Sequence, residues 1–152
     1  MKQYLVIFIL ILCVAASGCG SGFKVTGKVM FSDGQPLTVG KVIFTNGQIS
    51  AFGKINSHGE YRLGLIKEGD GIPAGTYQVY ITEAFQPGDN SLSYKDEEGQ
   101  IVTPLVLVID PKFTVASQSG LKCEVNGSMK FDIQVEKPGK DYKPLPTKDD
   151  LL

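Results

Sequence analysis

The sequence has few of the side chains on which most enzyme and metal sites depend. Its 152 residues include three cysteines, one histidine and no tryptophan. Because zinc sites take several histidine or cysteine ligands, a single histidine excludes a multi-histidine metal site. A Ser-His-Asp triad would have to use His58, which stands between Ser57 and Gly59 in a sequence typical of a turn. We therefore expect no catalytic residue, no metal and no cofactor.

The sequence also lacks an excess of charge of one sign and a long apolar run. Basic residues number 15 and acidic residues 16, which gives a formal net charge of -1. Nucleic acids and anionic lipid surfaces attract strongly basic proteins, so both are poor partners by this measure. The longest apolar run, residues 4–16, is shorter than the roughly 20 residues that a membrane-spanning helix requires.

The first residues have the pattern of a secretory signal. Lys2 precedes the apolar run, and the small residues Ala16-Ser17-Gly18 lead from it to Cys19. A charged start, a short apolar middle and a small-residue exit are typical of a signal that is cleaved. This exit resembles the bacterial lipobox, in which the chain is cut just before a cysteine and that cysteine is acylated.

The lipobox resemblance implies a lipoprotein of a bacterial cell envelope. It places a signal peptide at residues 1–18, acyl chains such as palmitate on Cys19, and a flexible tether at residues 19–23. Each buried methylene contributes about 0.8 kcal/mol, so several acyl chains anchor a protein firmly. Gly20 after the cysteine favours the outer membrane, with the domain facing the periplasm or the surface. The alternatives are an uncleaved anchor and an ordinary signal with an incidental cysteine.

The cysteines leave no disulfide within the mature chain. Cys13 is lost with the signal and Cys19 carries lipid, so Cys123 has no partner. In residues 121–125 apolar side chains alternate with Lys122 and Glu124, which places Cys123 on the inward face of a strand. We therefore interpret Cys123 as a buried thiol that acts as a small hydrophobic residue, rather than as a reactive thiol.

From residue 24 onward the apolar residues recur with a period of two, which is typical of strands. Asn46-Gly47 and Asn126-Gly127 each predict a hairpin. Residues 84–103 are polar and are predicted to form a long loop, in which Leu92-Ser93-Tyr94 is alternatively part of a short hairpin. One domain is expected over residues 24–136, and a disordered polar tail over residues 137–152. Strands are expected near residues 25–31, 41–45, 49–55, 61–65, 77–81, 105–109, 121–125 and 129–135.

The order of several short motifs resembles the carboxypeptidase regulatory-like domain. These motifs are Gly27-Lys28-Val29, Asp33-Gly34-Gln35-Pro36-Leu37, Val42, Phe44, Gly59-Glu60-Tyr61-Arg62-Leu63 and Pro73-Ala74-Gly75-Thr76-Tyr77-Gln78-Val79. The closing block, residues 111–133, is similar to small envelope lipoproteins of planctomycete-type bacteria that pair a lipobox with this domain. The resemblance implies an all-β fold, a seven-stranded antiparallel sandwich of the transthyretin (prealbumin) type, and a module without catalytic residues of its own.

The remaining features define a candidate binding surface. It combines the long loop with the apolar run at residues 105–109, which is predicted to be an edge strand able to pair with another chain. A proline in place of Val106 is expected to disrupt such pairing. The acidic run in the loop is interpreted as solvated, with calcium binding as the alternative. The candidate residues are Tyr80, Phe85, Tyr94, Asp96, Glu97, Glu98 and Val106.

These features support one functional hypothesis over two others. The first is a non-catalytic, lipid-anchored envelope protein that docks another envelope protein through the candidate surface. The alternative is a module that binds carbohydrate or wall polymer, with Tyr80 and Tyr94 stacking on sugar rings. A hydrolase is the least favoured hypothesis, because the sequence shows no convergent set of titratable groups.

Overall fold

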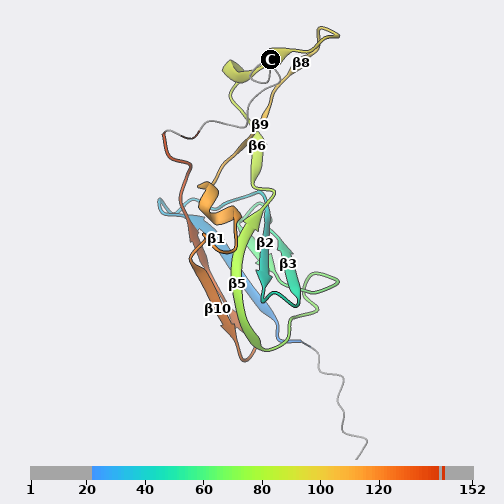
Figure 1. Ribbon diagram of the computed structural model, residues 1–152, viewed down its shortest axis with the longest axis vertical. Coiled ribbons are helices and arrows are strands. Elements are labelled where there is room, and N and C mark those ends of the chain that lie inside the picture. The colour runs from blue at the N-terminus through green and yellow to red at the C-terminus, as the bar shows by residue number, and fades with distance from the viewer. Residues whose placement is uncertain (1–21, 141, 143–152) are drawn as a thin grey trace, which may run out of the picture.

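The computed structural model describes residues 22–140 and residue 142 (Figure 1). Within this part the chain is all-β, as the sequence predicts, with twelve strands, two short 3₁₀ helices and no α-helix. None of the helices in these residues is long and apolar enough to cross a membrane. The predicted signal peptide, Cys19, most of the tether and the end of the tail lie outside the described residues.

The first of two four-stranded sheets is built around the first strand, β1 (Val25–Phe31). On one side β1 pairs with β4 (Glu60–Arg62) in the antiparallel direction. On the other side it pairs in the parallel direction with β11 (Met129–Lys130) and then with β12 (Ile133–Val135). Both parallel pairings have the same sequence offset, so β11 and β12 are one strand that is interrupted for two residues.

The interruption coincides with a close approach of two backbones. A methyl group on Gly27 would overlap the carbonyl oxygen of Phe131. That oxygen accepts a 2.5 Å hydrogen bond from the hydroxyl of Tyr61, whose pKa is raised by burial so that it stays a donor. The N–H of Lys28 donates to the carboxylate of Asp132 at 2.8 Å. Gly27 therefore lets β1 and the last strand meet, and side chains complete the hydrogen bonding where the ladder stops.

The second sheet is antiparallel throughout. The predicted hairpin at Asn46-Gly47 is confirmed, and Gly47 has the positive φ of 86° that favours glycine in such a turn. The loop between Asn56 and Gly59 then carries the chain to β4 in the first sheet. The order of strands is β10 (Leu121–Val125), β5 (Gly75–Thr82), β2 (Lys41–Thr45) and β3 (Ser50–Lys54).

Buried side chains of both sheets form one hydrophobic cluster. Phe44 on β2 is fully buried, and its ring lies 6.1 Å from the Tyr77 ring of its own sheet and 5.7 Å from Phe131 of the first sheet. Tyr77 is fully buried, which confirms the prediction for this ring, and its hydroxyl donates to the carbonyl of Pro73. Cys123 on β10 is also buried, and burial raises the pKa of its thiol, as expected of an unreactive cysteine.

The second predicted hairpin, at Asn126-Gly127, is wrong. β10 pairs with β5 in the second sheet, whereas β11 pairs with β1 in the first, so these two residues carry the chain between sheets. The central residues of a type I′ hairpin turn both need positive φ, and Gly127 does not have it. The first sheet is consequently mixed, which corrects the expectation of a wholly antiparallel fold.

Contacts of the domain continue beyond Glu136. The ammonium of Lys137 lies 2.7 Å from the carboxylate of Asp33, which lowers the pKa of that carboxyl, and 5.4 Å from the centre of the Phe31 ring. Tyr142 packs against the hydrophobic cluster. The first residues of the predicted tail therefore take part in the packing of the domain.

Candidate functional site

A two-stranded arm projects from one end of the molecule, whereas β1 begins at the other end (Figure 1). At its base β6 (Phe85–Pro87) pairs with β9 (Leu105–Leu107). Farther out, the 3₁₀ helix η1 (Asn90–Leu92) precedes the pair formed by β7 (Tyr94–Lys95) and β8 (Ile101–Val102). We call residues 85–107 the ribbon arm. The predicted loop is thus largely paired, and the alternative of a short hairpin is confirmed for Tyr94, whereas Leu92 lies in η1.

The ribbon arm concentrates the exposed apolar side chains. Among the described residues nine large hydrophobic side chains are exposed, and five of them lie on this short segment. Ile101 is 75% exposed and Leu105 is 64% exposed. Phe85, Leu92 and Tyr94 are the other three. Single exposed apolar residues are ordinary, but a group of five on one projection is typical of an interaction surface.

The acidic run forms the turn at the tip of the ribbon arm. The carboxylate of Asp96 accepts hydrogen bonds from the N–H groups of Glu98 and Gln100, at 3.0 and 2.8 Å, and Gly99 has a φ of 78°. Asp96 therefore closes a turn between β7 and β8. Within the described residues no group of three or more His, Cys, Asp or Glu is arranged to hold a metal ion, so geometry gives the calcium alternative no support.

The two sides of β9 differ in what their backbone groups can do. Gly88 donates to Pro104 and Val108 donates to Ala84, so the amides at even positions of this strand face β6. By alternation the N–H of Val106 belongs to the ladder inside the ribbon arm, and that of Leu105 points to the open edge. A proline at position 106 would therefore break the arm itself, whereas one at position 105 would block only its outer edge.

Tyr80 lies apart from the other candidate residues. It is on the outward face of β5, in a cross-strand row with Ile43 of β2 and Phe52 of β3. All three side chains are partly buried. The structure therefore brings Phe85, Tyr94 and the acidic turn together on the ribbon arm, and it places Tyr80 on the second sheet.

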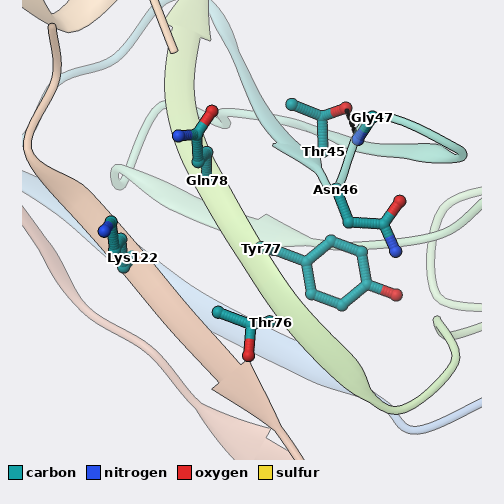
Figure 2. Close-up of a pocket in the computed structure, with 7 residues that line it drawn as sticks. All are labelled: Thr45, Asn46, Gly47, Thr76, Tyr77, Gln78 and Lys122. Atoms are coloured by element: carbon teal, nitrogen blue, oxygen red, sulfur yellow. Dashed lines mark hydrogen bonds between the residues drawn. The ribbon is translucent and has the colours of Figure 1, made fainter. Parts of the chain in front are cut away.

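A shallow depression of about 380 Å³ lies on the second sheet beside the β2–β3 hairpin (Figure 2). Thr45, Gln78 and Lys122 lie side by side across β2, β5 and β10, because Gln78 pairs with each of the other two. Asn46 and the edge of Tyr77 form another part of its wall. These groups can hydrogen-bond a polar ligand, but none of the predicted site residues is among them.

The sequence analysis placed the long loop and the run at residues 105–109 in the candidate surface, but it did not single out three of the five exposed apolar residues, namely Leu92, Ile101 and Leu105. Ile101 follows an acidic, Gly-containing turn, and Leu105 opens an apolar run after a proline. An apolar residue that directly follows a polar turn or a proline was the signal that could have identified these two. His58 lies exposed in the turn before β4, with its ring 3.5 Å from the Ser57 hydroxyl, as interpreted from the sequence.

Comparison with known proteins assigns no family. No family model matches the chain, and no curated protein matches it. Among solved structures it is similar to a DUF3823 family protein from Bacteroides ovatus, with 15% identity and a TM-score of 0.40, over 75% of this chain and 44% of that one. It is also similar to BcpA, the major pilin subunit of Bacillus cereus, with 13% identity and a TM-score of 0.41, over 77% of this chain and 30% of the pilin. The chain thus spans less than half the length of either protein, and these distant likenesses extend only to β-rich domains.

Proposed function

We propose that this chain is a non-catalytic, lipid-anchored module of a bacterial envelope, and that it docks another envelope protein through the ribbon arm. The anchor is the acylated Cys19 expected from the sequence. The body is proposed to be a sandwich of the transthyretin type, as in carboxypeptidase regulatory-like domains. In support of this architecture, β11 and β12 count as one strand, so seven strands surround the shared core. The projecting arm with its exposed apolar residues is the observation that carries the docking function.

The chemistry of the ribbon arm indicates the kind of partner. It carries one lysine and four carboxylates, a net charge of -3, and its apolar side chains lie on both sides of the acidic turn. Burial of a few large apolar side chains supplies most of the energy of a typical interface, and surrounding charges select the partner. The complementary surface is therefore an apolar groove with a basic rim on another protein.

The test compares capture of a partner by two matched variants. The full-length protein is used as bait on solubilised envelope proteins, and the captured species is identified and its affinity measured. Replacing both Ile101 and Leu105 with serine is expected to weaken binding at least tenfold, or about 1.4 kcal/mol, because both are exposed on the arm.

The control is Val115→Ser, which alters an exposed apolar residue outside the ribbon arm, at the end of η2 (Pro111–Thr114). This variant is expected to bind as the unmodified protein does. Equal capture by the unmodified protein and the arm variant, with both folded, would rule out docking through the ribbon arm.

A second candidate function is binding of carbohydrate or wall polymer by the second sheet. The outward row of Phe52, Ile43 and Tyr80 favours it, since aromatic faces stack on sugar rings. The neighbouring row of Thr45, Gln78 and Lys122 supplies hydrogen-bonding groups. The two rows lie two residues apart on β2 and β5, so they face the same side of the sheet and form one surface.

Co-sedimentation with protein-free wall polymer separates this candidate from docking. If the second sheet binds polymer, Tyr80→Ala is expected to reduce retention about tenfold, whereas Tyr94→Ala on the ribbon arm leaves it unchanged. The reverse pattern would assign polymer binding to the arm. No retention of the unmodified protein would exclude the polymer function.

A further inference from the structure

A second group of exposed apolar side chains lies where the described chain begins. Ile66 is 89% exposed, Leu65 is 37% exposed and Phe23 is 36% exposed. Phe23 forms a two-way backbone bridge with Ile72, and Gly64 bridges Gly71, so residues 64–72 lie beside the start of the chain. The Gly64–Gly71 bridge therefore holds the loop that carries Leu65 and Ile66 next to the Phe23–Ile72 bridge. These three side chains therefore belong to one edge of the molecule.

The loop that carries Ile66 is a closed turn. The carboxylate of Asp70 accepts hydrogen bonds from the N–H groups of Leu65 and Lys67, at 3.0 and 3.1 Å, and Asp70 donates its own N–H to Lys67. These bonds fix the backbone on both sides of Ile66 and hold its side chain outward. The turn thus keeps the Ile66 side chain exposed, and with Leu65 and Phe23 it forms a group of exposed apolar residues that is typical of an interaction surface.

The position of this edge relative to the expected lipid identifies that environment. Only four peptide units separate Cys19 from Phe23, so the two Cα atoms lie at most about 14 Å apart. Acyl chains on Cys19 insert in a bilayer, which brings Phe23 and the neighbouring loop to the membrane surface. The ribbon arm lies at the far end of the molecule (Figure 1).

The charged side chains near this edge favour contact with an anionic membrane surface more than the net charge of -1 of the whole sequence suggests. Lys24, Arg62 and Lys67 take part in none of the ion pairs of the described residues. The two nearby carboxylates, of Glu68 and Asp70, accept hydrogen bonds from backbone N–H groups, and these five side chains together have a net charge of +1. The ribbon arm has a net charge of -3. Anionic headgroups therefore attract the edge that carries Phe23 and repel the arm.

We propose that Phe23, Leu65 and Ile66, flanked by Lys24, Arg62 and Lys67, form a membrane-contact edge that inserts into the headgroup region of the bilayer carrying the lipid anchor. The proposal rests on the lipid anchor of the proposed function, and it adds an orientation. With this edge on the bilayer, the domain stands on the membrane and directs the ribbon arm away from it.

Because the sequence contains no tryptophan, a single introduced indole reports the environment of one site. The full-length lipidated protein carrying Ile66→Trp is reconstituted in vesicles of phosphatidylcholine with about one-quarter phosphatidylglycerol. Ile101→Trp at the tip of the ribbon arm is the matched control, since that isoleucine is also highly exposed. Phe23→Trp is a second reporter on the edge.

Indoles at positions 66 and 23 are expected to emit at shorter wavelength than the indole at 101 and to be quenched by brominated lipid. Their quenching by aqueous acrylamide is expected to be about threefold weaker than at 101. If all three indoles behave alike while the protein floats with the vesicles, the membrane-contact edge is wrong and the anchor stands. If the protein fails to float, both the lipid anchor and the membrane-contact edge are wrong. Docking through the ribbon arm is tested separately, by partner capture.

Discussion

Replacing Gly27 with alanine is expected to lower the free energy of unfolding by at least about 3 kcal/mol. The added methyl group would overlap the carbonyl oxygen of Phe131 and come within 2.9 Å of the Tyr61 ring. Neither neighbour can move freely, because the oxygen is backbone and the Tyr61 hydroxyl is hydrogen-bonded to it. Relief of the overlap requires β1 and the last strand to separate. Urea denaturation followed by circular dichroism measures the change.

Gly127→Ala is the control for this substitution. Gly127 has no atom within 4 Å of the position that the methyl group would take, and its φ is not positive. Alanine there is expected to change the free energy of unfolding by less than about 0.5 kcal/mol. If the two alanine variants are equally stable, the close pairing of the first and last strands at Gly27 is incorrect.

Truncation of Phe44 to alanine is expected to cost about 3–5 kcal/mol of unfolding free energy. The side chain is fully buried, and its ring contacts Tyr77 in the second sheet and Phe131 in the first. Its removal therefore leaves a cavity between the two sheets, whose partly rigid walls cannot close around it. Thermal and urea unfolding of the purified variant give the measurement.

Phe85→Ala makes the same chemical change on the ribbon arm. Phe85 is 40% exposed and lies outside the shared cluster, so we expect its loss to cost less than about 1 kcal/mol. A large loss of stability from this variant would contradict the separation of the arm from the core. Similar small losses from both variants would show that Phe44 does not join the two sheets.

The strands of the two four-stranded sheets were largely predictable, because the alternation of apolar and polar residues that indicates a strand lies within the strand itself. Alternation in residues 25–31 and 77–81 identifies β1 and the middle of β5, and the inward positions of Val25, Val29, Tyr77 and Val79 are all buried. Asn46-Gly47 predicted its hairpin because a short antiparallel connection needs only a suitable turn and two apolar strands. A period of two reports which face of a strand is buried, and these strands each have one buried face.

The choice of partner strand was not predictable in the same way. Asn126-Gly127 has the composition of a hairpin turn, but β11 joins β1 across most of the chain instead of returning to β10. The sequence near Met129 does not indicate which strand pairs with β11. The signal that existed was Gly27, since a glycine on the inward face of a strand is typical of a close backbone approach.

The sequence indicated where along the chain the candidate surface lies, but not the strand pairing that shapes it. The sequence analysis proposed the polar segment at residues 84–103 as part of a binding surface, and the structure places Tyr94 and the acidic turn toward the tip of the ribbon arm. Its paired base was missed because β6 is short, contains Pro87, and pairs with residues on the far side of the intervening turn. The edge near Ile66 was missed because exposure of an apolar residue within a Gly-rich loop depends on how that loop closes.

The pairing of β1 with β11 and β12 also sets the order in which the chain can fold. Residues 104 positions apart must meet before the first sheet has its central contact, so nearly the whole domain must be available at once. Closing so large a loop is a slow, late step, because its entropy is lost before the native contacts offset it. In a chain that emerges from a translocation channel with its amino end first, the first sheet therefore cannot be completed until the last strand has passed. Under the lipoprotein assignment proposed above, this topology would delay completion of the fold until export has ended.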